Sequence, residues 1–125
     1  MSTVYIIQNP QRWDGDKGQM VGRFDFSSSH LYGEPVFLLS PTAAPFNGGP
    51  IIRELEEKLD PFRPEDFLLM VGNPVIIAWS GIIAQRALAW NTGNPDAMPA
   101  CLQWSGKDRQ YIEVTGVDLT EAGGI

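Results

Sequence analysis

Short apolar segments alternate with stretches of helical length along much of the chain. Residues 3–8, 35–40 and 67–71 are rich in β-branched, aromatic and leucine side chains, without a regular polar alternation. Runs of this kind are typical of strands that are buried on both faces of a sheet. They predict three buried strands, and the first of them is expected to be central.

Helical spacing follows the second of these strands. Ile51, Ile52, Leu55 and Leu59 recur on one side of residues 50–59, and charged residues occupy the other side. This spacing predicts an amphipathic helix.

A second helix is predicted over residues 74–90, because Gly72-Asn73-Pro74 supplies a capping asparagine and a first-turn proline. The order strand, helix, strand, helix is typical of parallel strands joined by crossovers. Residues 101–104 and 110–114 flank a turn-forming cluster and predict an antiparallel hairpin. The predicted fold is therefore α/β, a small mixed sheet of parallel core strands plus a C-terminal antiparallel hairpin, with two main helices.

The length of 125 residues is too short to give two domains adequate cores. We expect a single compact α/β domain over residues 1–120 and a flexible tail over residues 121–125. Residues 11–33 are polar and rich in glycine and serine. They predict a short hairpin around residues 14–18 and an extended segment over residues 23–26.

Apolar residues surround the second predicted helix on most sides. Such a helix must be covered by other parts of its own chain or by another subunit. We expect a homo-oligomer that buries Ile76, Trp79, Ile83 and Trp90 between copies. The alternative is that residues 11–33 fold over this helix.

No charged residue occurs from Phe67 to Gln85, so a membrane span has to be considered. Gly72-Asn73-Pro74 divides this stretch into a strand and a helix, and an isolated strand would leave its backbone groups unpaired in lipid. We therefore expect no membrane insertion. The N-terminus lacks the features of a secretory signal, and the single cysteine, Cys101, requires no oxidising compartment. These features predict a cytosolic location.

The net negative charge of the chain argues against nucleic acid as a partner. Fifteen acidic and nine basic residues give a net charge of −6 with the single histidine neutral. An acidic surface repels phosphate backbones, so no strong nucleic-acid binding is expected, and a basic or neutral partner surface is more natural.

The junction at Gly72, Asn73 and Val75 is a candidate ligand site. It lies where a predicted parallel strand ends and a helix begins, and the backbone N–H groups of a helix N-terminus favour an anion such as a nucleotide or an acidic metabolite. The alternative is that Asn73 only caps the helix and that Pro74 removes a donor.

Aromatic and basic residues meet on the predicted C-terminal hairpin, at Trp104, Lys107, Arg109 and Tyr111. Such mixtures hold single-stranded nucleic acid in some proteins, but two basic residues on an acidic chain are few. Cross-strand aromatic pairing is the first interpretation, and a protein-contact surface is the second.

Other candidate constellations are incomplete. Asp14, Asp16 and Asp25 match part of a calcium-loop spacing, but the loop lacks its turn glycine and its flanking helices. His30 follows three serines without a nucleophile elbow, and Cys101 is expected to be a small buried hydrophobe. We therefore predict no catalytic residues, no metal site and no cofactor.

Two strings carry a resemblance to a known group. Residues 66–74 read Asp-Phe-Leu-Leu-Met-Val-Gly-Asn-Pro, and residues 102–112 read Leu-Gln-Trp-Ser-Gly-Lys-Asp-Arg-Gln-Tyr-Ile. With the apolar helix between them, they resemble a group of small proteins of tailed bacteriophages and prophages that share the motif Asp-Phe/Tyr-Leu-Leu-x-Val-Gly-Asn/Asp-Pro. The resemblance covers most of the chain apart from residues 11–33 and the tail, and it departs in the long segment 91–99. It implies a phage setting and a recurrent fold, without a reaction.

These observations leave two main hypotheses and a weaker third. The first is a non-enzymatic phage accessory protein, a homo-oligomer in the host bacterial cytoplasm that binds and perturbs a host protein. The second is a nucleotide- or metabolite-binding domain that uses the junction near Asn73. The third is a component of the virion.

Overall fold

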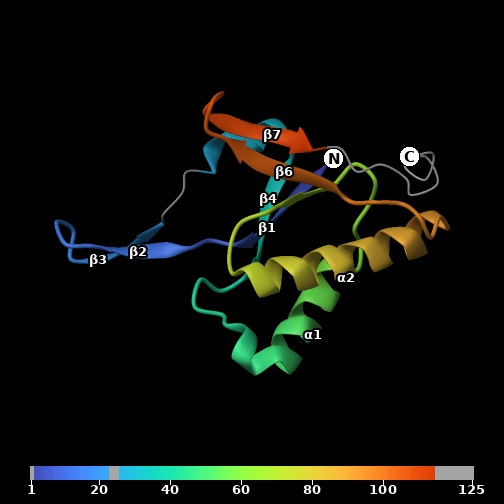
Figure 1. Ribbon diagram of the computed structural model, residues 1–125, viewed down its shortest axis with the longest axis horizontal. Coiled ribbons are helices and arrows are strands. Elements are labelled where there is room, and N and C mark those ends of the chain that lie inside the picture. Colours follow the sequence, from blue (N-terminus) through green and yellow to red (C-terminus); the bar gives the residue numbers. More distant parts are fainter. Residues whose placement is uncertain (1, 23–25, 115–125) are drawn as a thin grey trace.

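A mixed sheet forms the centre of the protein. The computed structural model describes residues 2–22 and 26–114, and in these residues five strands lie in the order β4-β1-β5-β6-β7 (Figure 1). β1, β4, β5 and β6 are parallel to one another, and β7 is antiparallel to β6. The strands are β1 Thr3–Gln8, β4 Glu34–Leu39, β5 Phe67–Leu69, β6 Ala100–Ser105 and β7 Gln110–Val114. The predicted α/β class, with parallel core strands and a C-terminal hairpin, is confirmed.

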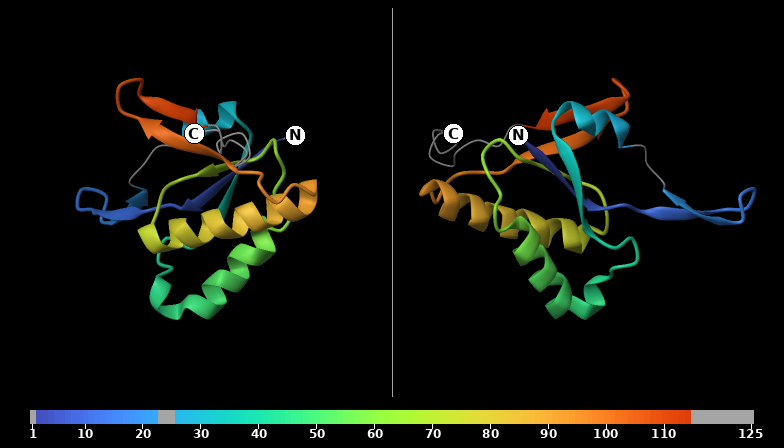
Figure 2. Two further views of the ribbon diagram at one scale, coloured as in Figure 1. Left: turned by 45° about the vertical axis from the view of Figure 1, so that its right-hand side comes forward. Right: turned by 180° about the vertical axis from the view of Figure 1, so that it is seen from behind.

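Helices α1 (Gly48–Leu59) and α2 (Pro74–Thr92) cover one face of the sheet, here called the helix face (Figures 1 and 2). Both crossovers, from β4 through α1 to β5 and from β5 through α2 to β6, advance in the same direction across the sheet. Crossovers of one hand that advance in one direction must place their helices on the same face. The connection from β1 to β4 runs the other way, and its short helix η1 (Ser27–Leu31) lies on the opposite face.

Strand β1 contributes to both cores, as its uninterrupted apolar run predicted. Tyr5 and Ile7 pack with the helices, whereas Val4 and Ile6 pack on the opposite face. Alternate side chains of a strand point to opposite faces, so a strand with a core on each side needs no polar alternation. β1 is an interior strand between β4 and β5.

The burial of strand β4 differs from the prediction. It was expected to be buried, but it is an edge strand, and Phe37 is 44% exposed. Only Leu38 and Leu39 are buried, where β4 passes beneath α1. The pattern of apolar residues could not reveal this, because it does not say which strand lies at the edge of the sheet.

Residues 11–22 form the predicted hairpin, and they do so outside the sheet. β2 (Gln11–Asp14) pairs with β3 (Gln19–Gly22) as a separate two-stranded ribbon that projects away from the body (Figures 1 and 2). The alternative in which residues 11–33 cover the second helix is wrong, because the ribbon extends outward and η1 lies on the opposite face of the sheet. Most of the predicted extended segment 23–26 and all of the predicted tail lie outside the described residues.

Within the described part of the chain, no helix is long and apolar enough to cross a bilayer. The uncharged stretch from Phe67 onward is divided between β5 and α2, as the sequence predicted.

Candidate functional site

The junction between β5 and α2 is held by Gln8, which ends β1. The side-chain Nε2 of Gln8 donates hydrogen bonds to the carbonyls of Ser40 at 3.1 Å and Ala43 at 2.8 Å, and its Oε1 accepts the N–H of Asn73 at 3.0 Å. A Cβ on Gly72, whose φ is +131°, would lie 2.7 Å from Cβ of Gln8. Gln8 therefore joins the carboxyl ends of three strands, and glycine is needed where the chain passes it.

Asn73 caps α2. Its Oδ1 accepts the backbone N–H groups of Val75 at 2.9 Å and Ile76 at 3.4 Å. These are donors that an anion at the helix N-terminus would use. Gly72, Asn73 and Val75 lie at this junction, and the Asn73 side chain occupies the backbone N–H donors of the first turn.

An open cavity of about 490 Å³ adjoins this junction. It lies at the carboxyl ends of β1 and β5, the point where the strand order reverses and where ligands collect in open α/β sheets. None of the described residues that line it is charged. The cavity offers amide and apolar groups, and it lacks a basic side chain for a phosphate.

The C-terminal hairpin brings Trp104 and Tyr111 together as a cross-strand pair, with ring centroids 5.2 Å apart. Tyr111 is buried, and its carbonyl accepts the hydroxyl of Tyr32 at 3.0 Å. Trp104, Lys107 and Arg109 are exposed at the end of the hairpin. A partner could therefore reach these three residues, whereas Tyr111 belongs to the core.

Arg109 has a φ of +53° in the turn of this hairpin. Residues other than glycine seldom adopt this left-handed conformation. The turn is otherwise held by Ser105, whose hydroxyl donates to the Asp108 carboxylate at 3.0 Å and accepts the backbone N–H of the same residue at 3.2 Å.

The remaining chemical candidates lie in turns or in packed positions. Asp14 accepts the backbone N–H groups of Asp16 and Lys17 and so closes the β2–β3 turn. Burial raises the pKa of the Cys101 thiol, which disfavours the reactive thiolate. Among the described residues, no three His, Cys, Asp or Glu side chains are grouped so that they could hold a metal ion.

The four residues predicted at an interface between copies do not share one surface. Ile76 and Ile83 are buried in the core of the helix face, and Trp79 is half-buried against it. Ile76 therefore cannot reach a partner, and Ile83 borders the surface only where it lines the space between α1 and α2. Trp90 is 88% exposed.

Other apolar residues of α2 are uncovered instead. We call Val75, Ala78, Ile82 and Trp90 the outer residues of α2. All four are exposed, and Ile82 is 59% exposed. The sequence showed that α2 is apolar on most sides, but only the fold shows which side the described part of the chain leaves uncovered.

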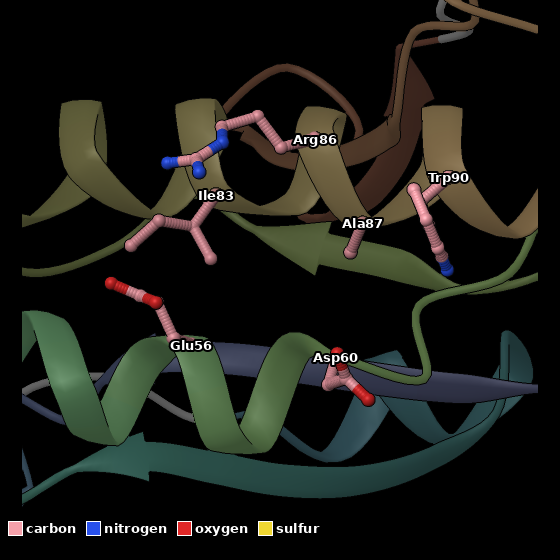
Figure 3. A pocket seen from close by; sticks show the side chains of 6 residues that line it. All are labelled: Glu56, Asp60, Ile83, Arg86, Ala87 and Trp90. Atoms are coloured by element: carbon pink, nitrogen blue, oxygen red, sulfur yellow. The ribbon is translucent and has the colours of Figure 1, made fainter.

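A groove of about 270 Å³ separates α1 from α2 (Figure 3). Ile83 and Ala87 form its apolar floor, and Figure 3 shows Glu56 and the Arg86 guanidinium towards one end and Asp60 and Trp90 towards the other. No hydrogen bond or ion pair joins the side chains of Glu56, Asp60 or Arg86 to another described residue. We call this feature the α1–α2 groove. Sequence reasoning missed it, because its two walls come from different helices.

Comparison with known proteins gives a family for this chain. The chain matches the family described as phage Pam3 gp32-like protein over residues 2–117. The chain belongs to this family. The match includes every strand and helix described above, so the phage setting expected from the resemblance is confirmed. No curated protein and no solved structure matches the chain.

Proposed function

We propose that this phage protein is a non-catalytic accessory protein that acts through protein contacts, by self-association through α2 and by engagement of a host protein in the host cytoplasm. The observation that carries the proposal is the set of outer residues of α2, apolar side chains that the protein's own fold leaves uncovered. Contiguous apolar surface on a monomer usually marks an interaction site.

The charge distribution supports self-association through this helix. Copies that each carry a net charge of −6 repel one another over most of their surfaces. Residues 74–92 contain no Asp or Glu and one Arg. A contact through α2 therefore uses a segment that carries no acidic side chain. Trp90 is suited to anchor it, since tryptophan is enriched among residues that dominate binding energy.

The exposed end of the β6–β7 hairpin supports the second part of the proposal. Trp104 and Arg109 are residue types that anchor interfaces, and Arg109 keeps a side chain at a position that glycine would occupy without strain. Residues held in unfavourable backbone conformations cluster at functional sites.

Self-association is tested by Ile82→Asp, with Leu31→Asp as the matched control. Both positions are exposed apolar residues, but Leu31 lies in η1 on the opposite face of the sheet. Light scattering after size exclusion should show an oligomer for wild type and Leu31→Asp at tens of micromolar, and a monomer for Ile82→Asp with unchanged circular dichroism. A wild-type monomer throughout this range would remove the proposal.

Host binding is tested by affinity capture from host lysate with wild type, Trp104→Ala and Arg109→Ala. The expected result is one stoichiometric host protein with wild type and its loss with both variants, while the thermal unfolding of each variant shows an intact fold. Unchanged capture by both variants would contradict a role for this end of the hairpin.

The cavity near Asn73 favours a second candidate, a metabolite- or nucleotide-binding domain. Its uncharged lining suits the base or amide part of such a ligand better than a phosphate. A thermal-shift screen of nucleosides and nucleotides tests it, and no stabilisation by any compound would contradict it. The weaker hypothesis of a virion component is tested by mass spectrometry of purified particles.

A further inference from the structure

The β2–β3 ribbon carries apolar side chains that the described part of its own copy leaves exposed. Trp13 and Met20 are direct cross-strand partners, so their side chains share one face of the ribbon. They are 63% and 52% exposed. The ribbon hydrogen-bonds to no strand of the main sheet in the described chain. A two-stranded hairpin alone is marginally stable in water, and packing against another element would stabilise it.

The α1–α2 groove also has apolar and charged side chains without a partner in the described chain. Its floor is apolar, Trp90 stands exposed at one end, and three charged side chains around it lack a described partner. The ribbon projects away from the body in all views (Figures 1 and 2), so it does not fill the groove of its own copy.

Ribbon and groove match in charge. The turn of the ribbon presents Asp16 and Lys17, one acidic and one basic side chain without a described ion-pair partner. Glu56 and Arg86 present the opposite pair at one end of the groove (Figure 3). A ribbon turn placed there joins Lys17 to Glu56 and Asp16 to Arg86.

The ribbon is long enough to follow the groove. Asp16 lies in the turn after β2, so Trp13 lies less than about 10 Å behind it, which is the length of three extended residues at roughly 3.3 Å each. Glu56 and Asp60, like Arg86 and Trp90, are one helical turn apart, or about 6 Å along the helix axis. A turn seated at the Glu56 end therefore places Trp13 and Met20 towards the Trp90 end of the groove.

We propose that the β2–β3 ribbon of one copy docks in the α1–α2 groove of a second copy. The proposal rests on the self-association proposed above and names the segment of the second copy that contacts α2. The two surfaces are different, so the contact is heterologous, and it closes either by reciprocal exchange in a dimer or around a ring.

Cysteine cross-linking tests the contact in the full-length chain. The Met20→Cys/Ala87→Cys pair is prepared in a Cys101→Ser background, and the control pair is Met20→Cys/Glu57→Cys, because Glu57 is exposed on α1 and does not line the groove. Under mild oxidation, the first pair should give disulfide-linked oligomers on a denaturing gel at least tenfold faster than the control pair and either single variant.

A charge exchange tests the orientation. Lys17→Glu should weaken self-association about tenfold, and the added Glu56→Lys should restore it, as measured by sedimentation. Lack of rescue would contradict the assigned orientation.

Failure of this inference differs from failure of the proposed function. If wild type is oligomeric, Ile82→Asp is monomeric and the cross-link does not exceed its control, then α2 mediates self-association without the ribbon and the inference is overturned. If wild type is monomeric at all concentrations, both fail. A ribbon that binds a host protein instead would leave the cross-link absent and host capture sensitive to Trp13→Ala.

Discussion

Asp66 is the most constrained charged residue of the described chain. Its buried carboxylate accepts the N–H of Thr3 at 2.9 Å and the N–H of Arg63 at 2.9 Å, and the Arg63 guanidinium lies 3.3 Å away. The hydrogen bond from Arg63 to Asp66 and the charge of this carboxylate raise the pKa of Arg63. Asp66 thus ties the start of β1 to the turn before β5.

Asp66→Asn should lower the free energy of unfolding by about 2–3 kcal/mol, because an amide group replaces one acceptor oxygen and leaves a buried donor opposite another donor. Glu65→Gln is the control, since Glu65 is half-exposed and forms only a surface ion pair with Arg63. Its effect should stay within about 0.5 kcal/mol. Urea unfolding of both variants measures the difference, and equal effects would contradict the role of Asp66.

Cys101 predicts a dependence on alkaline pH. Burial raises the pKa of its thiol from the ordinary value of 9.0, so the folded state favours the neutral form. Its contribution to stability is complete below the ordinary pKa and is lost as the pH rises through the raised value. Wild type should therefore lose more unfolding free energy between pH 8 and pH 10.5 than Cys101→Ser, in which the other titrating groups are unchanged. Parallel losses in urea titrations would contradict the shift.

Side chains such as Gln8 and Asp66 could not be assigned roles from the sequence. The chain shows a glutamine at the end of an apolar run and an aspartate before another, but their partners lie up to 65 residues away. The Asn73 cap could be predicted, because its side-chain oxygen accepts N–H groups that lie within three residues along the chain. Contacts that depend on the order of strands in the sheet cannot be predicted from such local patterns.

At the scale of elements, the junction from β5 to α2 depends on one glycine. Gly72→Ala should destabilise the protein by about 2–4 kcal/mol, because the new Cβ meets Cβ of Gln8 and the positive φ disfavours any side chain. Gly81→Ala is the matched control in the middle of α2, where a Cβ meets nothing within 4 Å. It should stabilise the fold by about 0.5–1 kcal/mol. Thermal unfolding that shows equal signs for both variants would contradict this reading.

The sequence predicted which helices and strands form, but it predicted less well which of their sides are covered by the rest of the fold. Helices α1 and α2, strands β1, β4 and β5 and both hairpins were predicted, because periodicity, caps and turn residues act within a few positions. The exposure of β4 and the uncovered side of α2 were not predicted. Both depend on where the chain places its neighbours, which periodicity does not encode.

At the scale of the whole molecule, docking of the ribbon makes the stability of the folded state depend on the protein concentration. A partner that binds only the folded state stabilises it by mass action, and free partner at a hundred times its Kd adds about 2.7 kcal/mol to the free energy of unfolding. For a chain of this size, that corresponds to an increase in Tm of several degrees. The melting temperature of wild type should therefore rise between 1 and 100 µM.

Trp13→Ala supplies the control for this effect. Trp13 is exposed within its own copy, so its removal should leave the Tm at 1 µM nearly unchanged while abolishing the rise with concentration. Ile82→Asp should also abolish the rise, whereas Leu31→Asp should retain it. A Tm that rises equally in wild type and Trp13→Ala would show that copies associate without the ribbon. The three variants together therefore distinguish two modes of association. One uses only the outer residues of α2, and in the other the ribbon of each copy docks in the α1–α2 groove of the next.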